Sequence, residues 1–248
     1  MKRLWQQLDR LLRGQDGLRS ESALGQLEAR HLVIAAVLLG ILYGFFMGWY
    51  GLFSRATPEY RQALACMWKV PALFLLTLFI CFPSLYVFSA LLGSRLTFGP
   101  TLKLLLAVVA LTVTVLASFG PIVAFFAVST ENYPFMKLLN VAFFAVAGAL
   151  GVSALLRALR SLIGVGDTPP PLPATPPVLT RREELESPDR QVEALFRVWI
   201  LIYGLAGAQM GWVLRPFIGD PAQAFTWFRA RQANFFVDVW RSLISLFS

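Results

Sequence analysis

The sequence predicts an all-α protein, a polytopic transmembrane helical bundle of about five spans with an interfacial amphipathic helix at each end. The first observation is composition: 57% of the 248 residues are hydrophobic and 15% are charged, which is outside the range of ordinary soluble domains. The second is that the apolar residues gather in five runs, each of about 20 residues, the length that crosses the hydrocarbon core of a bilayer. The third is the near absence of charge within those runs.

Residues 1–30 precede the first apolar run and are predicted to form a basic amphipathic segment. In MKRLWQQLDRLLRG the leucines fall on one helical face and the basic side chains mostly on the other, a pattern typical of a helix lying on anionic headgroups. We expect Trp5 at the interface. A helix packed on the cytoplasmic surface of a partner fits the pattern equally well. A cleaved signal peptide does not fit, because the apolar run begins only near residue 32.

Residues 31–164 are predicted to form a four-span transmembrane region. The first span runs from about residue 32 to 53 and carries no charge. Gly40, Gly44 and Gly48 recur at intervals of four, so they form one groove along the helix and predict close packing against another helix. That helix belongs either to the same subunit or to another copy, and the first alternative is the simpler one.

The second span is predicted from about residue 71 to 92, after a polar segment at 54–69. Pro71 suits the start of a helix. Pro83 falls inside the span, where it removes a backbone hydrogen bond and is expected to kink the helix. The hydroxyl of Ser84 is a candidate to bind the carbonyl that Pro83 leaves free.

The third and fourth spans are predicted at about residues 101–128 and 135–156. Gly120 and Pro121 interrupt the third span near its far end. The fourth span carries the amide of Asn140. Hydroxyl groups suited to interhelical hydrogen bonds occur on the third span, at Thr112, Thr114 and Ser118.

A Pro-rich linker, residues 165–193, separates the fourth span from the fifth. Its proline density favours an extended polyproline II conformation. We expect it on the cytoplasmic side, as a tether or as a ligand for a cytoplasmic adaptor. The fifth transmembrane helix is predicted at residues 194–215.

The fifth helix combines small residues with one amide. Gly204, Gly207 and Gly211 recur at helical spacing and predict a second face for close helix packing. Gln209 lies in the middle of the apolar run. An amide at that depth needs a hydrogen-bond partner, most simply on a neighbouring helix.

Residues 216–248 are predicted to form an amphipathic C-terminal helix in the interface. Trp212 and Arg215 mark the membrane surface where the fifth span ends. Along AQAFTWFRARQANFFVDVWRSLISLFS, apolar residues follow helical spacing and polar residues line the opposite side, and the segment is too charged to span. Trp227 and Trp240 are expected at the level of the headgroups.

The distribution of basic residues predicts the orientation. Of the 22 basic residues, 14 lie in the N-terminal segment, the loop between the second and third spans, and the linker with its flanks. The positive-inside rule therefore favours an N-terminus inside and a C-terminus outside. Because the basic residues flank apolar spans, their charge indicates anionic lipids as partners rather than nucleic acid.

The contents of the spans argue against an enzyme. At depth they offer only the amides of Gln209 and Asn140, without the ionisable or nucleophilic groups that proton relays, ion-coupled carriers and intramembrane hydrolases use. No nucleotide-binding or metalloprotease motif occurs in the sequence. We therefore predict no catalytic residue, no cofactor and no metal site. Cys66 and Cys81 are expected to be buried thiols, and His31 an interfacial histidine.

Two stretches resemble known proteins. The run GAQMGWVLRPFIGDP, followed by FRARQANFFVDVW, resembles the C-terminal signature of a family of uncharacterised bacterial polytopic membrane proteins. The stretch YVFSALLGSRLTFGPTLKLLL and the helices after it are distantly similar to the Yip1-like multi-span superfamily. The resemblance implies about five spans, an N-terminus inside, the bacterial cytoplasmic (inner) membrane, and a function in organising membranes or recruiting partners.

Two functions follow as hypotheses. The first is a non-enzymatic integral membrane subunit that acts as scaffold, anchor or assembly factor of a larger membrane complex, in contact with other subunits or copies of itself. The alternative is a passive channel or lipid-moving protein. In the alternative, Pro83, Gly120 and Pro121 allow movement, and Gln209 lines a polar path together with Asn140.

Overall fold

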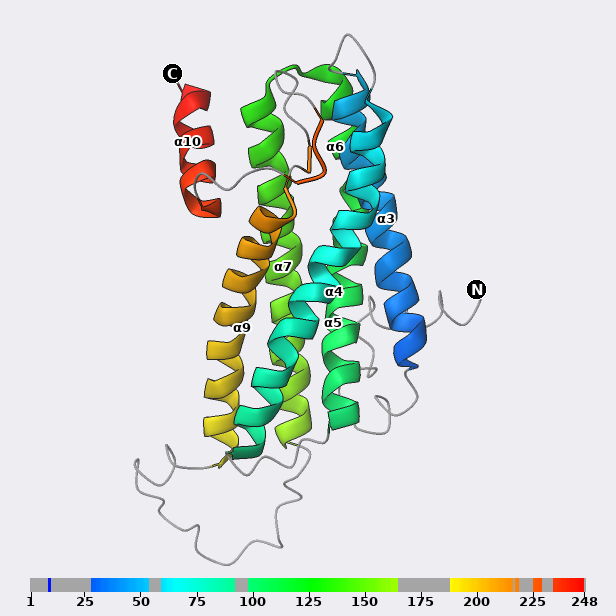
Figure 1. Ribbon diagram of the computed structural model, residues 1–248. Coiled ribbons are helices and arrows are strands. Elements are labelled where there is room, and N and C mark those ends of the chain that lie inside the picture. The colour runs from blue at the N-terminus through cyan, green and yellow to red at the C-terminus, as the bar shows by residue number, and fades with distance from the viewer. Residues whose placement is uncertain are drawn as a thin grey trace, which may run out of the picture.

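The computed structural model is helical throughout most of the part of the chain that it describes (Figure 1). Five of the described helices are long and apolar enough to cross a membrane, which confirms the all-α fold class and the five predicted spans. The described residues are 9, 28–53, 59–91, 98–164, 188–215, 217–218, 225–228 and 234–247. The candidate spans are Ala29–Phe53, Tyr60–Val87, Phe98–Ser129, Tyr133–Ala158 and Ala194–Val213.

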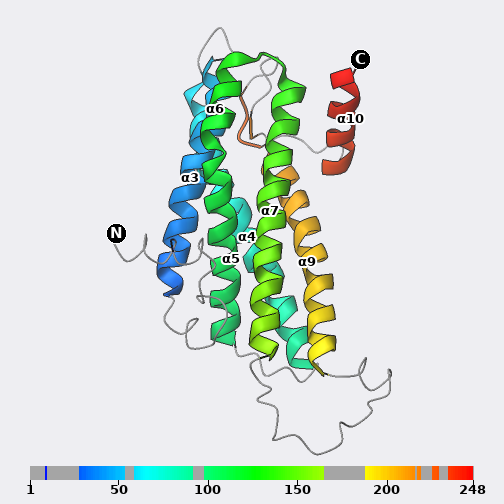
Figure 2. The same cartoon turned by 180° about the vertical axis from the view of Figure 1, so that it is seen from behind.

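The spans form one bundle of helices that run up and down in alternation (Figures 1 and 2). In chain order the helices are α3 (Ala29–Phe53), α4 (Tyr60–Leu91), α5 (Phe98–Ser118), α6 (Gly120–Ser129), α7 (Tyr133–Gly164), α9 (Pro188–Val213) and α10 (Phe235–Phe247). We call the end of the bundle where α6 lies the α6 end; α3 ends there, and α4 and α7 begin there. Trp5, most of the Pro-rich linker and the Gly219 to Pro221 turn lie outside the described residues.

The glycine groove of the first span packs against α4 of the same chain. Gly44 makes the closest approach, because a Cβ added there would lie 2.4 Å from the backbone oxygen of Cys66. A Cβ on Gly40 or Gly48 would also press on α4. The groove therefore lets two backbones meet within one subunit, and α3 packs more extensively on α4 than on any other helix.

The second span begins earlier than the sequence pattern predicts. α4 starts at Tyr60 and continues through both Pro71 and Pro83, so the polar segment before Pro71 is mostly helix rather than loop. The prediction of a helix start at Pro71 is wrong because the polar residues of this segment share a helix with buried apolar ones. Ser84 donates to the carbonyl of Cys81 at 2.7 Å, one turn back, and not to the carbonyl that Pro83 leaves free.

The third span breaks where Gly120 and Pro121 predict it. α5 ends at Ser118, and α6 begins at Gly120 with the proline in its first turn. Gly120 lies against α3, since a Cβ there would be 2.3 Å from a ring carbon of Phe46. The hydroxyls expected to join helices instead bind carbonyls of their own helix, because that acceptor is always within reach. This holds for Thr112, Thr114 and Ser118.

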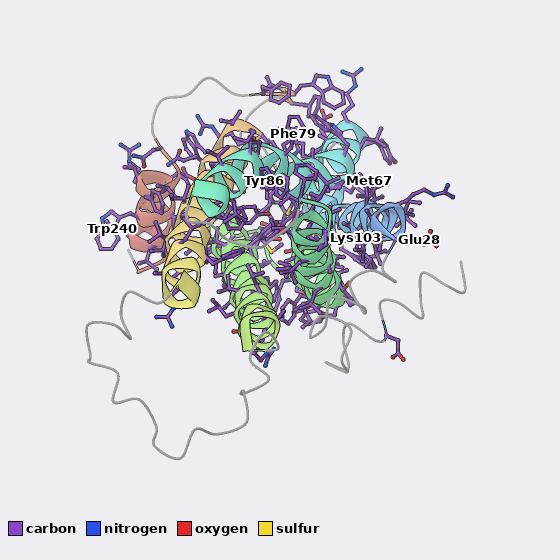
Figure 3. All side chains as sticks on the ribbon, turned by 90° about the horizontal axis from the view of Figure 1, so that it is seen from below. Glu28, Met67, Phe79, Tyr86, Lys103 and Trp240 are labelled. Carbon is purple, nitrogen blue, oxygen red and sulfur yellow. The ribbon has the colours of Figure 1, made fainter. Side chains whose placement is uncertain are left out.

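The last two spans pack on different neighbours. α7 packs on α5, where Gly151 faces the side chain of Thr112. α9 packs on α4, where the indole Nε1 of Trp199 donates to the carbonyl of Cys81 at 3.0 Å. α7 and α9 stand side by side (Figure 3) but make few contacts with each other. The two helices are therefore held in place by other helices and not by each other.

The C-terminal helix is shorter than the amphipathic pattern predicts. Residues 225–228 lie outside any helix, with bends at 227 and 228, and the helix covers only Phe235–Phe247. Asn234 caps its first turn, because its side-chain oxygen accepts from the amide of Val237 at 3.0 Å. α10 stands alongside α7 near the α6 end, roughly parallel to the bundle (Figures 1 and 2). The aromatic residues of 225–228 contact α4 instead of extending the helix, as described below.

Candidate functional site

A partly open cavity of about 1050 Å³ lies between α4, α5, α7, α9 and α10. Most of its wall is apolar. On α7 the lining residues run from Tyr133 to Leu155, which corresponds to about 33 Å of helix at 1.5 Å per residue. The cavity therefore extends along a length comparable to the hydrocarbon core of a bilayer.

Glycines hollow out this cavity. Gly204 on α9 and Gly148 on α7 both line it, and a Cβ added to either would meet nothing within 4 Å. Gly207 and Gly211 also line the cavity and approach α4 only loosely. A Cβ added to Gly207 would lie 3.8 Å from the side chain of Thr77, and one added to Gly211 would lie 3.4 Å from that of Leu73. The predicted close packing of Gly204, Gly207 and Gly211 is therefore not formed within the described part of the chain. A small side chain permits close approach but does not enforce it.

Aromatic rings form much of the wall. Phe74 of α4 stacks on Phe144 of α7, with ring centroids 5.8 Å apart and planes within 8°. On α9, Trp199 stacks on Tyr203 at 5.1 Å. All four rings line the cavity. The two stacks give the cavity a rigid apolar wall.

One end of the cavity is charged. Lys137 of α7 and Asp238 of α10 form an ion pair at 2.9 Å, and the ammonium of Lys137 also lies 5.0 Å from the ring centroid of Tyr133. These three residues line the cavity near the α6 end. The ion pair joins α10 to α7 and places the first turn of α10 at the mouth of the cavity.

Trp212 and Arg215 belong to the same end. The guanidinium carbon of Arg215 lies 3.7 Å from the ring centroid of Trp212, a cation–π contact. Both side chains line the cavity, and Trp212 is only 7% exposed. The ring of Trp212 therefore faces the cavity and not the outside of the bundle, and its place at the level of the membrane surface stays a prediction. Trp227 and Trp240 are exposed, and Trp240 projects away from the bundle (Figure 3).

The two intramembrane amides do not converge. Asn140 is 4% exposed, accepts a hydrogen bond from the hydroxyl of Tyr43 at 2.7 Å and donates to the carbonyl of Met136 at 2.9 Å. It lines the cavity with its hydrogen bonds satisfied. Gln209 is half-buried and does not line the cavity. The polar path expected from Gln209 and Asn140 is therefore not formed.

Gln209 lies instead on an exposed side of α9. It shares that side with Val198, Ile202 and Leu205, each at least half exposed. No hydrogen bond of the Gln209 side chain to another described residue is seen. An amide on an otherwise apolar exposed face is costly in hydrocarbon, so this face is suited to contact with another protein helix.

The sequence analysis missed a buried lysine within the second span. Lys69 is 0% exposed; its ammonium donates to the carbonyl of Trp227 at 2.6 Å and lies 5.1 Å from the ring centroid of Phe228. Gln62 and Cys66, on the same side of α4, both donate to the backbone carbonyl of Phe217, a residue that lines the cavity. The helical spacing of Gln62, Cys66 and Lys69 was the signal that could have revealed a polar helix face.

The sequence analysis also missed Lys137, Asp238 and Tyr203 as parts of one site. Lys137 lies one turn before Asn140 on the same face of α7, so the spacing within the fourth span was a usable signal. No sequence signal connects Asp238 with Lys137, because 101 residues separate them.

No metal site is formed by the residues that the structure describes, since no three His, Cys, Asp or Glu side chains gather there. Cys66 and Cys81 are buried free thiols. His31 pairs with Glu28 at 3.1 Å near the start of α3. The cavity itself offers apolar walls along its length and charged and polar groups at one end.

No protein-family model matches the chain, and no curated protein or solved structure matches it either. The resemblance to bacterial polytopic and Yip1-like proteins thus stays a prediction.

Proposed function

We propose that this chain is a lipid-binding membrane protein that holds a single lipid molecule in the cavity between α7 and α9. The observation that carries this proposal is the cavity itself: about 1050 Å³ of mostly apolar space that lies along transmembrane helices and ends in charged groups. Small-molecule sites of about 300–1,000 Å³ bury most of a drug-sized ligand, so the space suits a long amphiphile.

The apolar wall favours acyl chains over water. Water is stable in a cavity only where several polar groups bind it, and most of this wall offers none. Inside a bilayer the nearest apolar material is lipid. An acyl chain that enters between α7 and α9 would lie parallel to the helices and would fill the space that Gly148 and Gly204 leave open.

The orientation predicted from the basic residues places the bound lipid in one leaflet. With the N-terminus inside, the α6 end faces away from the cytoplasm. The polar end of the lipid would then lie in the outer leaflet of the membrane, which we propose is the bacterial cytoplasmic membrane. Binding needs no catalytic group, in keeping with a non-enzymatic protein.

The test is to measure lipid retained by the full chain after purification in a gentle detergent, by native mass spectrometry and lipid extraction. We expect the wild-type chain to retain lipid in stoichiometric amount. Gly148→Leu combined with Gly204→Leu should lower the retained lipid several-fold, because two leucine side chains would occupy the cavity.

Gly99→Leu is the matched control. A Cβ at Gly99 also meets nothing within 4 Å, but Gly99 does not line the cavity. It should retain lipid like the wild type. A wild-type chain that purifies without lipid, or a filled cavity that retains as much lipid as the control, would contradict the proposal.

A second candidate function is a subunit of a larger membrane complex, acting as scaffold, anchor or assembly factor. The observation that favours it is the exposed apolar side of α9 that carries Gln209. In this proposal the partner is another membrane subunit or a second copy whose helix supplies the hydrogen-bond partner of the amide. The two functions are compatible, because Gln209 itself does not line the cavity, although Leu205 on the same side of α9 does.

A further inference from the structure

We infer that the α6 end of the cavity binds the anionic, phosphate-bearing headgroup of a membrane lipid. This inference rests on the proposed lipid-binding function and names the class of lipid. Three observations lead to it: where the charged side chains lie, which buried donor at this end has no acceptor, and what covers the ring of Trp212.

The charged side chains of the cavity lie together at one end. Among the described residues that line it, the charged ones are Lys137, Arg215 and Asp238. Lys137 is paired with Asp238 at 2.9 Å, and the guanidinium of Arg215 lies over the ring of Trp212. Cations at the edge of an apolar cavity attract an anionic group more strongly than they would in water, because less solvent screens them.

One buried donor at this end, the indole Nε1 of Trp212, has no acceptor within the described part of the chain, and its side chain lines the cavity. The hydroxyl of Tyr203 also has no acceptor there, but it lies nine residues earlier on α9, about 13 Å along the helix, and belongs to the middle of the cavity. Trp212 is 93% buried, since it is 7% exposed. The indole nitrogen can only donate, and leaving a buried donor unpaired is costly. The missing partner must therefore offer acceptor oxygens, as a phosphate does.

The same ring argues against a cationic headgroup. Quaternary ammonium groups are bound over the faces of aromatic rings. In this cavity the guanidinium of Arg215 lies over the ring of Trp212, at 3.7 Å. A choline or ethanolamine group would meet two positive charges and an occupied ring face. A phosphate that carries a neutral alcohol would meet the indole donor of Trp212 and the two cations, beside the Asp238 carboxylate that is paired with Lys137.

The test compares two lipids with identical acyl chains. The full chain is placed in nanodiscs of phosphatidylcholine that contain a minor fraction of phosphatidylglycerol, and the lipids it retains after gentle detergent extraction are identified by mass spectrometry. We expect phosphatidylglycerol to be retained several-fold above its share of the bilayer. Trp212→Phe and Arg215→Gln should each lower that enrichment while total retained lipid stays near the wild-type amount.

Asp238→Asn should change the enrichment of phosphatidylglycerol in the opposite direction. It removes the carboxylate that competes for Lys137, so the enrichment of phosphatidylglycerol should rise. If the charges served only to pack α10, this variant would lower retention of both lipids alike, which would overturn the inference. Arg241→Gln is the control, because Arg241 is an exposed cation of α10 that does not line the cavity.

The outcomes separate the two proposals. Equal retention of both lipids by the wild type would overturn the headgroup inference and leave the lipid-binding function standing. Retention of no lipid at all would overturn both. Glycerol phosphate, which has the headgroup chemistry without acyl chains, should not displace the retained lipid; displacement by it would indicate a site for a soluble anion and would overturn the assignment to a lipid.

Discussion

At the scale of single residues, the same amino acid serves two opposite purposes on two helices of this protein. Gly44 lets the backbone of α3 approach α4 until no side chain fits between them. Gly204, in a similar series of small residues on α9, stands beside open space. The spacing of the glycines is a property of one helix, whereas the neighbour that they meet is a property of the bundle.

This difference predicts opposite responses to one added methyl group. Gly44→Ala places a Cβ 2.4 Å from a backbone oxygen, so the helices must separate, and we expect a loss of about 1–3 kcal/mol of stability, as for overpacked cores. Gly204→Ala adds a methyl group without contact and improves helix propensity, so stability should be unchanged or slightly higher. Unfolding in detergent micelles measures both.

Equal destabilisation by the two alanines would contradict this account of the glycines. So would a neutral Gly44→Ala, which would mean that α3 and α4 do not meet at that residue. The two variants serve as controls for each other, because the chemical change is identical and only the surroundings differ.

At the scale of helices, a few polar contacts determine which elements are joined. The Tyr43 hydroxyl and the Asn140 amide link α3 to α7, and Lys137 with Asp238 links α7 to α10. Lys69 links α4 to the bends at residues 225–228. In an apolar bundle such contacts specify the arrangement of helices, because any other arrangement would leave the same groups unpaired.

The Tyr43 contact can be tested without changing the size of the side chain. Tyr43→Phe removes the hydroxyl that donates to Asn140 at 2.7 Å. We expect it to cost about 1–2 kcal/mol, within the range measured for interhelical hydrogen bonds in membranes. Unfolding of the purified chain in detergent is the measurement. Asn140→Leu should lower the free energy of unfolding less in the Tyr43→Phe variant than in the wild type, since the hydrogen bond between the two residues is already lost in that variant.

Tyr60→Phe provides the matched control for this pair. Tyr60 lies exposed at the start of α4, so loss of its hydroxyl should leave stability unchanged. If Tyr43→Phe behaves like Tyr60→Phe, the hydrogen bond does not hold α3 and α7 together.

At the scale of the whole molecule, the bundle combines a well-packed side with an open one. α3 packs closely on α4, α5 and α6, whereas α7 and α9 stand apart around the cavity. The outer side of α9 adds a row of exposed apolar residues with one amide, Gln209. The open side of the bundle therefore carries the two surfaces that our proposals use, one facing inward and one facing outward.

The outward surface predicts the behaviour of the protein in its native membrane. If a helix of another subunit or of a second copy binds the Gln209 amide, native gels and mass determination after gentle solubilisation should reveal a species larger than one chain. Gln209→Leu should weaken that association about three- to thirty-fold, the range that corresponds to one interhelical hydrogen bond.

Ser153→Leu is a suitable comparison for Gln209→Leu. Ser153 is also exposed, but on α7, and its hydroxyl is bound to the carbonyl of Ala149 in its own helix. It should leave the larger species intact. A wild-type chain that is monomeric under gentle conditions would contradict the subunit proposal and leave the lipid-binding proposal untouched.

The sequence by itself determined the all-α class, the five spans and the break at Gly120, because the transfer of about 20 apolar residues into a bilayer is a property of each segment alone. Only the tertiary structure decided that α4 begins at Tyr60, that Gly44 packs while Gly204 lines a cavity, and that Asn140 meets Tyr43 rather than Gln209. The reason is physical: which faces meet depends on contacts between segments far apart in the chain, and the periodicity of one helix carries no information about the surface opposite it.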